Sequence, residues 1–177
     1  RATHEPKKRF NAKKCNQNNN KKFSMRREKN SILVLTKYGD LSASTRHRFL
    51  QYKPWLEGAG LEVTIEPLLS NEYLEKKYKG LKVNRLKIIL SFFHRLNLLL
   101  FRRDFDLAIV QYELFPYLPG FFETLIFLAG KPVVYECDDA TFQRYYAHKK
   151  TFMRRILQGL LRNKLQSLLR KSVLAIC

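Results

Sequence analysis

The stretch ILVLT at residues 32–36 is a short, almost continuous apolar run, and it decides the fold. Runs of the same kind recur as DLAIVQ at 106–111, VVYE at 133–136 and SVLAIC at 172–177, each typical of a buried strand. LEVTIEPLL at 61–69 alternates apolar and polar residues and predicts one more strand. Segments of helical period lie between these strands. This alternation predicts an α/β fold: a doubly wound, Rossmann-like parallel sheet with helices on both faces.

Apolar spacing predicts the helices between the strands. Residues 45–59 form the first, with Phe49, Tyr52 and Leu56 on one face, Pro54 kinking or shortening it, and Gly58 and Gly60 ending it. Residues 84–102 form a long helix, and residues 121–128 and 151–171 form two more. The apolar residues along one side of the long helix are Leu86, Ile89, Phe93, Leu96 and Leu100.

Two clusters on these helices have open interpretations. Phe92, Phe93 and residues 98–101 are either core or a surface that dips into a membrane interface beside basic residues, namely Arg95, Arg102 and Arg103. The basic residues of the last helix are expected to form a solvated face: Arg154, Arg155, Arg162, Lys164, Arg170 and Lys171.

Composition limits the class of protein. The chain has 177 residues, 45% of them hydrophobic, so residues 31–177 can bury one core, while residues 1–30, with 11 Lys or Arg against two Glu, predict a disordered basic tail. That tail is either a solvated leader or an arm for anionic membrane or nucleic acid. No segment predicts a transmembrane helix, and three scattered cysteines favour a reducing, cytoplasmic setting.

Ligands of parallel α/β sheets bind beyond the carboxyl ends of the strands, so the loops there are the candidate site. The loop after the first strand is KYGDLSASTRHR at 37–48. The candidate substrate-binding residues in this loop are Gly39, Ser44, Thr45 and Arg46. A helix N-terminus binds anions, and the nearby arginines Arg46 and Arg48 add positive charge beside it. The alternative is that Ser44 or Thr45 simply caps the helix.

Two further loops carry carboxylates. Gln111 and Glu113 follow the third strand as candidate substrate ligands, although Glu113 equally suits a structural pair with a nearby arginine. Asp138 and Asp139 follow the fourth strand, close to Glu136, and are the candidate catalytic residues, with capping or charge neutralisation as the alternative. We expect no metal site and no cofactor, and we assign no catalytic role to the histidines.

Three segments in order, SASTRHRFLQYKPWLEGAGLEV, DLAIVQYELFP and GKPVVYECDDATF, resemble the amino-terminal domain of family 4-like GT-B glycosyltransferases. The resemblance spans residues 31–177. It implies retaining transfer of a sugar from a nucleotide-sugar to a glycan or lipid-linked acceptor, without a metal, in a cleft between this acceptor-side domain and a donor-binding carboxyl-terminal domain that residues 31–177 lack. Relative to the commonest family pattern, the first loop has one glycine where many members have two, and Asp138 and Asp139 stand where others carry histidine.

The net charge of +19 leaves a second class of function open. A non-catalytic basic module would dock on anionic membrane or nucleic acid, but nothing in the chain matches a nucleic-acid fold, so we expect no nucleic-acid partner. A peripheral position on the inner face of a membrane is compatible with both readings. A third possibility is that a separate chain supplies the donor domain.

Overall fold

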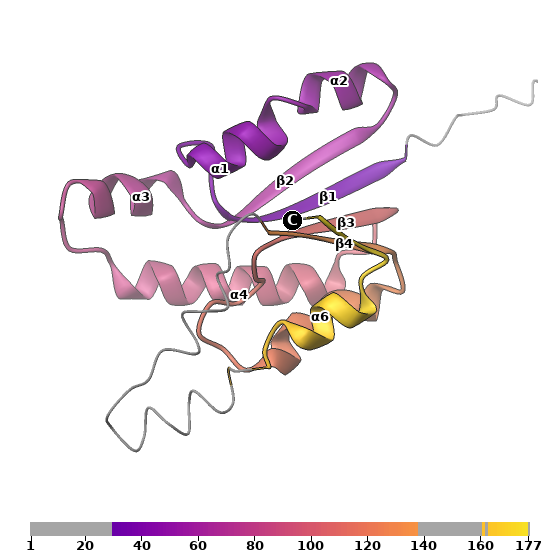
Figure 1. The fold of residues 1–177 in the computed structure, drawn as a ribbon. Helices are drawn as coiled ribbons and strands as arrows, with labels where there is room; N and C mark the ends of the chain where they lie inside the picture. The colour runs from indigo at the N-terminus through magenta and orange to yellow at the C-terminus, as the bar shows by residue number, and fades with distance from the viewer. Residues whose placement is uncertain (1–29, 138–160, 162, 177) are drawn as a thin grey trace, which may run out of the picture.

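The protein is described from a computed structural model, which covers residues 30–137, 161 and 163–176 (Figure 1). Five strands form one sheet in the order β2-β1-β3-β4-β5, and every neighbouring pair is parallel. The strands are β1 (Ser31–Tyr38), β2 (Glu62–Leu69), β3 (Leu107–Gln111), β4 (Val133–Glu136) and β5 (Leu174–Ile176). The predicted α/β parallel sheet is confirmed, and the architecture is consistent with the Rossmann-like class.

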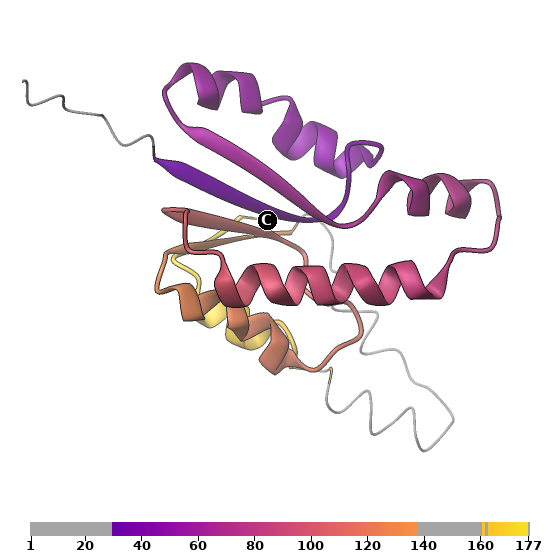
Figure 2. The ribbon, with the colours of Figure 1, turned by 180° about the vertical axis from the view of Figure 1, so that it is seen from behind.

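Helices cover both faces of the sheet. One layer consists of α1 (Ala43–Thr45), the π-helical η1 (Arg46–Leu50) and α2 (Lys53–Gly58), and the other contains α4 (Arg85–Phe101), the 3-10 helix η2 (Gly120–Ala129) and α6 (Gln166–Lys171) (Figures 1 and 2). The larger core lies beneath the α4 layer, and a smaller one lies under Phe49. This two-sided cover explains why β1 carries the almost continuous apolar run: Leu33, Val34 and Leu35 are all buried.

The last strand differs from its prediction. β5 lies at the edge of the sheet, and Val173, Leu174 and Ile176 are exposed, although the sequence pattern predicts a buried strand. An apolar run does not distinguish a central strand from an edge strand, because that depends on which strands pair with it. At the other end of the described chain, the carbonyl of Asn30 accepts a hydrogen bond from Glu62 N. Residues 1–29 of the predicted tail lie outside the described residues.

The helical segment predicted at 45–59 is divided in the structure, and the division lies just before Pro54, the residue expected to kink or shorten it. η1 ends at Leu50 and α2 begins at Lys53, which puts Pro54 in the first turn of α2, where its missing N–H costs no helical hydrogen bond. Phe49 is buried as expected, whereas Tyr52 lies at the break and is exposed. The sequence analysis also missed α3 (Asn71–Tyr78), whose start is capped by the Ser70 hydroxyl accepting from Tyr73 N.

The long helix α4 turns its predicted apolar stripe largely outward. Of that stripe only Leu96 packs against the core, while Leu86, Ile89, Phe93 and Leu100 are exposed. The residues that face inward are Leu99, Phe92 and, unexpectedly, Arg95. Because α4 is apolar on most of its circumference, periodicity alone cannot identify the buried side.

Arg95 is buried because it finds acceptors in the sheet. Its Nη2 donates to the carbonyls of Thr36 at 3.0 Å and Glu66 at 2.7 Å, which ties α4 to β1 and β2. Burial lowers the pKa of Arg95 to about 10, which still leaves the guanidinium charged at neutral pH. Of the three arginines that the membrane-facing alternative placed beside the surface, Arg95 is therefore buried in the fold.

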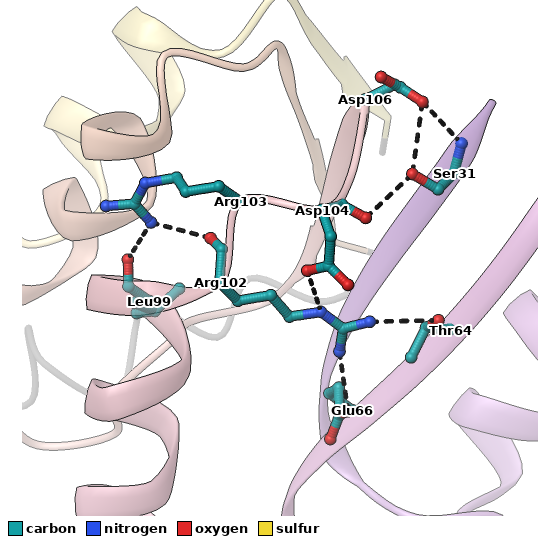
Figure 3. Close-up of polar contacts among 8 residues, drawn as sticks. All are labelled: Ser31, Thr64, Glu66, Leu99, Arg102, Arg103, Asp104 and Asp106. Carbon is teal, nitrogen blue, oxygen red and sulfur yellow. Dashed lines mark hydrogen bonds and ion pairs between the residues drawn. The ribbon is translucent and has the colours of Figure 1, made fainter. Parts of the chain in front are cut away.

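A polar network fixes the amino-terminal edge of the sheet (Figure 3). Asp106 accepts from Ser31 N at 2.8 Å, and this bond lowers the pKa of the Asp106 carboxyl. Arg102 pairs with Glu66 and Asp104, and Arg103 donates to carbonyls of the last turn of α4. Arg102 and Arg103 thus hold the connection between α4 and β3. Within the described residues no helix is long and apolar enough to cross a bilayer.

Candidate functional site

The candidate site lies at the carboxyl-terminal edge of the sheet, between β1 and β3. These strands are neighbours, but the chain leaves β1 toward α1 on one face and β3 toward η2 on the other (Figure 1). Such a reversal opens a crevice between the two departing loops, and ligands of doubly wound sheets bind there. Because the strands are parallel, the carboxyl ends of β1, β3 and β4 lie at this edge.

The loop after β1 is held by its own hydroxyls. Thr45 Oγ1 donates to the carbonyl of Tyr38 at 2.9 Å, and the Ser42 and Ser44 hydroxyls lie 2.9 Å apart. Ser42 occupies the N-cap position of α1 without a side-chain cap bond, so neither Ser44 nor Thr45 caps the helix as the simpler interpretation had it. Gly39 is buried against Asn71: a Cβ at Gly39 would lie 2.3 Å from Asn71 Oδ1.

The two arginines after this loop have different partners. Arg46 is exposed, and its Nη1 donates to the carbonyls of Asp40 and Leu41 at 3.1 and 2.9 Å. Arg48 forms an ion pair with Glu136 at the end of β4. The predicted pair therefore does not act as one clamp: Arg46 braces its own loop, and Arg48 links the first loop to the end of the fourth strand.

The chain makes a strained turn directly after β3. Tyr112 has a φ of 61°, and Glu113 N donates to the carbonyl of Gln111 at 2.8 Å, which closes a three-residue turn. A bulky residue with positive φ is rare, and strain of this kind concentrates at functional sites. Tyr117, further along the same loop, has a φ of 65°.

Gln111 occupies the last position of β3 and is 1% exposed. Its Nε2 has no hydrogen-bond acceptor among the described residues. A buried amide donor without an acceptor costs about 1–3 kcal/mol, so such a group suits a ligand oxygen. Of the substrate ligands predicted from sequence, Gln111 is the one whose buried donor is left available in this part of the chain.

Glu113 belongs to a buried cluster of charges. Lys164 Nζ lies 2.9 Å from Glu113 Oε2 and 3.1 Å from Glu123 Oε1, and it also donates to the carbonyl of Phe115. Lys37 approaches Glu113 from β1, with 3.8 Å between Nζ and Oε1. In the part of the chain that the structure describes, the basic partners of Glu113 are thus lysines, whereas the sequence analysis expected an arginine.

The second carboxylate of the cluster organises the loop after β3. Glu123 accepts from the backbone N–H groups of Leu114 at 2.6 Å and Phe115 at 3.1 Å. Burial raises the pKa of Glu123, and Lys164 together with these two bonds opposes the rise. Gly120 brings the start of η2 against the backbone of Lys164, since an added Cβ would lie 3.0 Å from Lys164 Cα.

The solvated face predicted for Lys164 is therefore wrong. Lys164 is 1% exposed and lies in a turn before α6, whereas Arg170 and Lys171 are exposed as expected. The sequence analysis assumed one continuous helix over residues 151–171, and its periodicity put Lys164 on the polar face. The turn at 163–165, which interrupts that periodicity, cannot be seen in the sequence pattern. The one available signal was Glu123, an acidic residue inside the apolar run FFETLIF.

The end of β4 supplies the third part of the edge. Glu136 is buried beside Gln111, its register partner on β3, and Tyr112 N donates to the Glu136 carbonyl at 2.9 Å. Asp138 and Asp139 follow immediately but lie outside the described residues, as do Arg154, Arg155 and Arg162. Their predicted roles stay predictions.

Neither protein-family models, nor curated proteins, nor solved structures match the chain. The chemistry of the site is therefore argued from its geometry. Among residues 30–137, 161 and 163–176, no three His, Cys, Asp or Glu side chains are placed to hold a metal ion. What the described edge offers is one buried amide donor, a strained turn and carboxylates fixed by basic side chains, which suits the positioning of a polar, hydroxyl-bearing ligand.

Proposed function

We propose that residues 31–177 form the amino-terminal, acceptor-side domain of a retaining glycosyltransferase of GT-B type. The enzyme would transfer a sugar from a nucleotide-sugar to a glycan or lipid-linked acceptor, in the cytoplasm. One observation carries the proposal: the segments that resemble this family, far apart in sequence, are joined at the switch point of the sheet. Arg48 pairs with Glu136 at the end of β4, and Lys37 at the end of β1 pairs with Glu113 after β3, so these parts of the three segments share one edge.

In this proposal the domain contributes position and electrostatics. Gln111 Nε2 donates to an acceptor hydroxyl, and the buried charges around Glu113 fix the loop that carries it. Glu113 acts through the loop, because its carboxylate is buried and held by lysines. Asp138 and Asp139, which follow β4 in the sequence, are the candidate catalytic residues, and the phosphate of the donor takes the acceptor proton. A second domain binds the nucleotide.

The proposal is tested by titrating the chain with a panel of nucleotide-sugars and nucleoside diphosphates, and by screening it on a printed glycan array. We expect no nucleotide-sugar binding tighter than about 1 mM and binding of particular glycans. Glycan binding should be lost in Gln111→Leu and retained in Gln51→Leu, which changes an exposed glutamine of the first loop region. Tight binding of a nucleotide-sugar, or glycan binding that ignores Gln111, would overturn the division of roles.

A further inference from the structure

Large apolar side chains dominate the outward side of α4, although Lys87 and Asn97 are also exposed on this helix. The large side chains on it are Leu86, Ile89, Leu90, Phe93 and Phe101, with exposed fractions of 61%, 51%, 57%, 64% and 76%. In Figure 2, α4 runs along the outside of the fold, in front of the sheet. A soluble surface rarely concentrates so many large apolar side chains on one helix, and a contiguous patch of this kind marks an interaction site.

A groove deepens this apolar face where α4 packs beside η2. It has a volume of about 390 Å³. Among the described residues its lining contains no polar side chain and consists of Ile88, Ile89, Phe92, Phe93, Leu96, Phe115, Leu118 and Phe122. Ligand sites that recognise polar molecules have a few polar groups among their apolar walls. A groove without them suits a hydrocarbon chain.

The exposed side chains at the start of the apolar face are basic. Residues 76–103 contain nine Lys or Arg and no Asp or Glu, but Arg95 is buried, and Lys76, Lys87 and Arg102 pair with carboxylates of neighbouring segments. Lys79, Lys82 and Arg85 are exposed and lie just before α4 or at its first residue. In Figure 1 α4 begins toward the end of the fold where β1 ends, although it lies on the opposite face of the sheet from α1. The basic end of the face is thus near the carboxyl-terminal edge.

Apolar residues on one helical face and basic residues at its border are the pattern of a helix that lies in a membrane interface. The apolar side chains enter the boundary of the acyl chains, and the long basic side chains reach the phosphates. The exposed basic residues Lys79, Lys82 and Arg85 border the face, and the phosphates of an anionic bilayer complement their charge. Charge complementarity therefore selects an anionic bilayer.

We propose that α4 docks in the plane of an anionic lipid bilayer, with an acyl chain in the groove between α4 and η2. Leu86, Ile89, Phe93 and Phe101 enter the hydrocarbon boundary, and Lys79, Lys82 and Arg85 contact the headgroup phosphates. The docking does not depend on the proposed sugar transfer. Failure of glycan binding and failure of membrane docking are separate outcomes, measured with different probes.

The sole tryptophan makes a sharp test possible. Trp55 is 82% exposed on α2, in the helical layer across the sheet from α4. A Trp55→Phe/Phe93→Trp variant of the full chain carries its only reporter on the docking face. With vesicles of phosphatidylglycerol and phosphatidylcholine, we expect its emission to shift to the blue and to be quenched by brominated acyl chains. The Trp55 emission of the unmodified chain should not be quenched. Quenching of Trp55 alone, or of neither reporter, overturns the proposal.

A second measurement separates docking by α4 from attraction by the basic tail. In Phe93→Gln/Phe101→Gln the net charge is unchanged, so binding through the tail would persist, whereas docking by α4 should weaken at least about tenfold in vesicle co-sedimentation. Trp55→Gln is the matched control and should bind as the unmodified chain does. Unchanged binding of the double variant contradicts the proposal. A dimer in sedimentation velocity that Phe93→Gln/Phe101→Gln dissociates would also contradict it and would assign the face to a second copy.

Discussion

The carboxyl-terminal edge of the sheet and the outward side of α4 depart from the usual distribution of side chains in opposite directions. At the edge, charged residues are buried: Glu113, Glu123 and Lys164 are each no more than 3% exposed. On α4, aromatic and aliphatic residues are exposed, with Phe93 at 64%. Buried charge is costly unless it is paired, and exposed apolar surface is informative when it is contiguous. Both regions therefore carry information that the regular core does not.

The two regions are expected to contribute differently to folding and to binding. The charged cluster is satisfied within the fold, so changing it should affect stability first. The apolar face contributes little to folding because much of it remains in water, so changing it should affect binding and leave stability alone. The following predictions test that separation, from the largest expected effect to the smallest.

Lys164→Met should have the largest effect. It removes the ammonium that lies between Glu113 and Glu123 and leaves two carboxylates buried together, which we expect to cost about 3–5 kcal/mol in the free energy of unfolding. Urea denaturation measures the loss. Arg170→Met, an exposed change on α6, serves as the control and should stay within about 0.5 kcal/mol. A similar loss in both variants would contradict the buried cluster.

Arg95→Met tests the inner side of α4. Without the guanidinium, the carbonyls of Thr36 and Glu66 lose their donor, and we expect a cost of about 2–4 kcal/mol in unfolding free energy. The matched change on the same helix is Arg85→Met, which is exposed and should be nearly neutral. If Arg95→Met proves as mild as Arg85→Met, Arg95 does not hold α4 on the sheet.

Gly39→Ala tests the packing of the first loop. The added methyl would lie 2.3 Å from Asn71 Oδ1, and we expect about 1–3 kcal/mol of destabilisation in thermal unfolding. Asn71→Ala should relieve much of it in the double variant, since the clash is with that side chain. Gly58→Ala is the control: its Cβ would meet nothing within 4 Å at a helical position, so the change should be slightly stabilising.

Asp106→Asn tests the opposite, amino-terminal edge through its pH dependence. The Ser31 N–H holds the folded-state pKa of Asp106 below its usual 3.8, so the stability that this carboxylate provides is present above pH 3.8 and is lost as the pH falls through the folded-state pKa. Urea unfolding between pH 7 and pH 2 should show that the variant has a lower free energy of unfolding than the parent at neutral pH, and that this difference disappears in acid. A gap of constant size would mean that the carboxylate charge is not involved.

Phe93→Gln should have the smallest effect on stability, within about 0.5 kcal/mol, although it removes a large aromatic ring. Leu99→Ala, on the buried side of the same helix, should cost about 2–5 kcal/mol. Differential scanning calorimetry of the two variants measures both. Marked destabilisation by Phe93→Gln would place the ring in the folding core and would remove the contrast between the two regions.

Much of the fold was predictable because the strands follow from local pattern. ILVLT, DLAIVQ and VVYE became β1, β3 and β4, since a strand covered on both faces needs a continuous apolar run. The orientation of α4 and the exposure of β5 were not predictable. Both depend on tertiary neighbours: α4 is apolar around most of its surface, and β5 is exposed because it lies at the sheet edge.

The site was predictable in outline and not in its pairings. Strand order brings the ends of β1, β3 and β4 together, so Gly39, Gln111 and Glu136 were expected at one edge. The partners of the charges were not, because Lys164 reaches Glu113 across 51 positions of sequence and Arg48 reaches Glu136 across 88. No local pattern encodes a contact of that separation, and the buried arginine and lysine both looked like surface residues.

The strand order also sets the order in which the chain can assemble. β1 is central, yet its neighbour β3 starts at Leu107, 76 positions after Ser31 (107 − 31), while β2 starts only 31 positions after it (62 − 31). At a synthesis rate of about 5–20 residues per second, roughly 4–15 s pass between the synthesis of β1 and that of β3, its partner on one edge. Until β3 is made, the hydrogen-bonding groups on that edge of β1 have no strand partner.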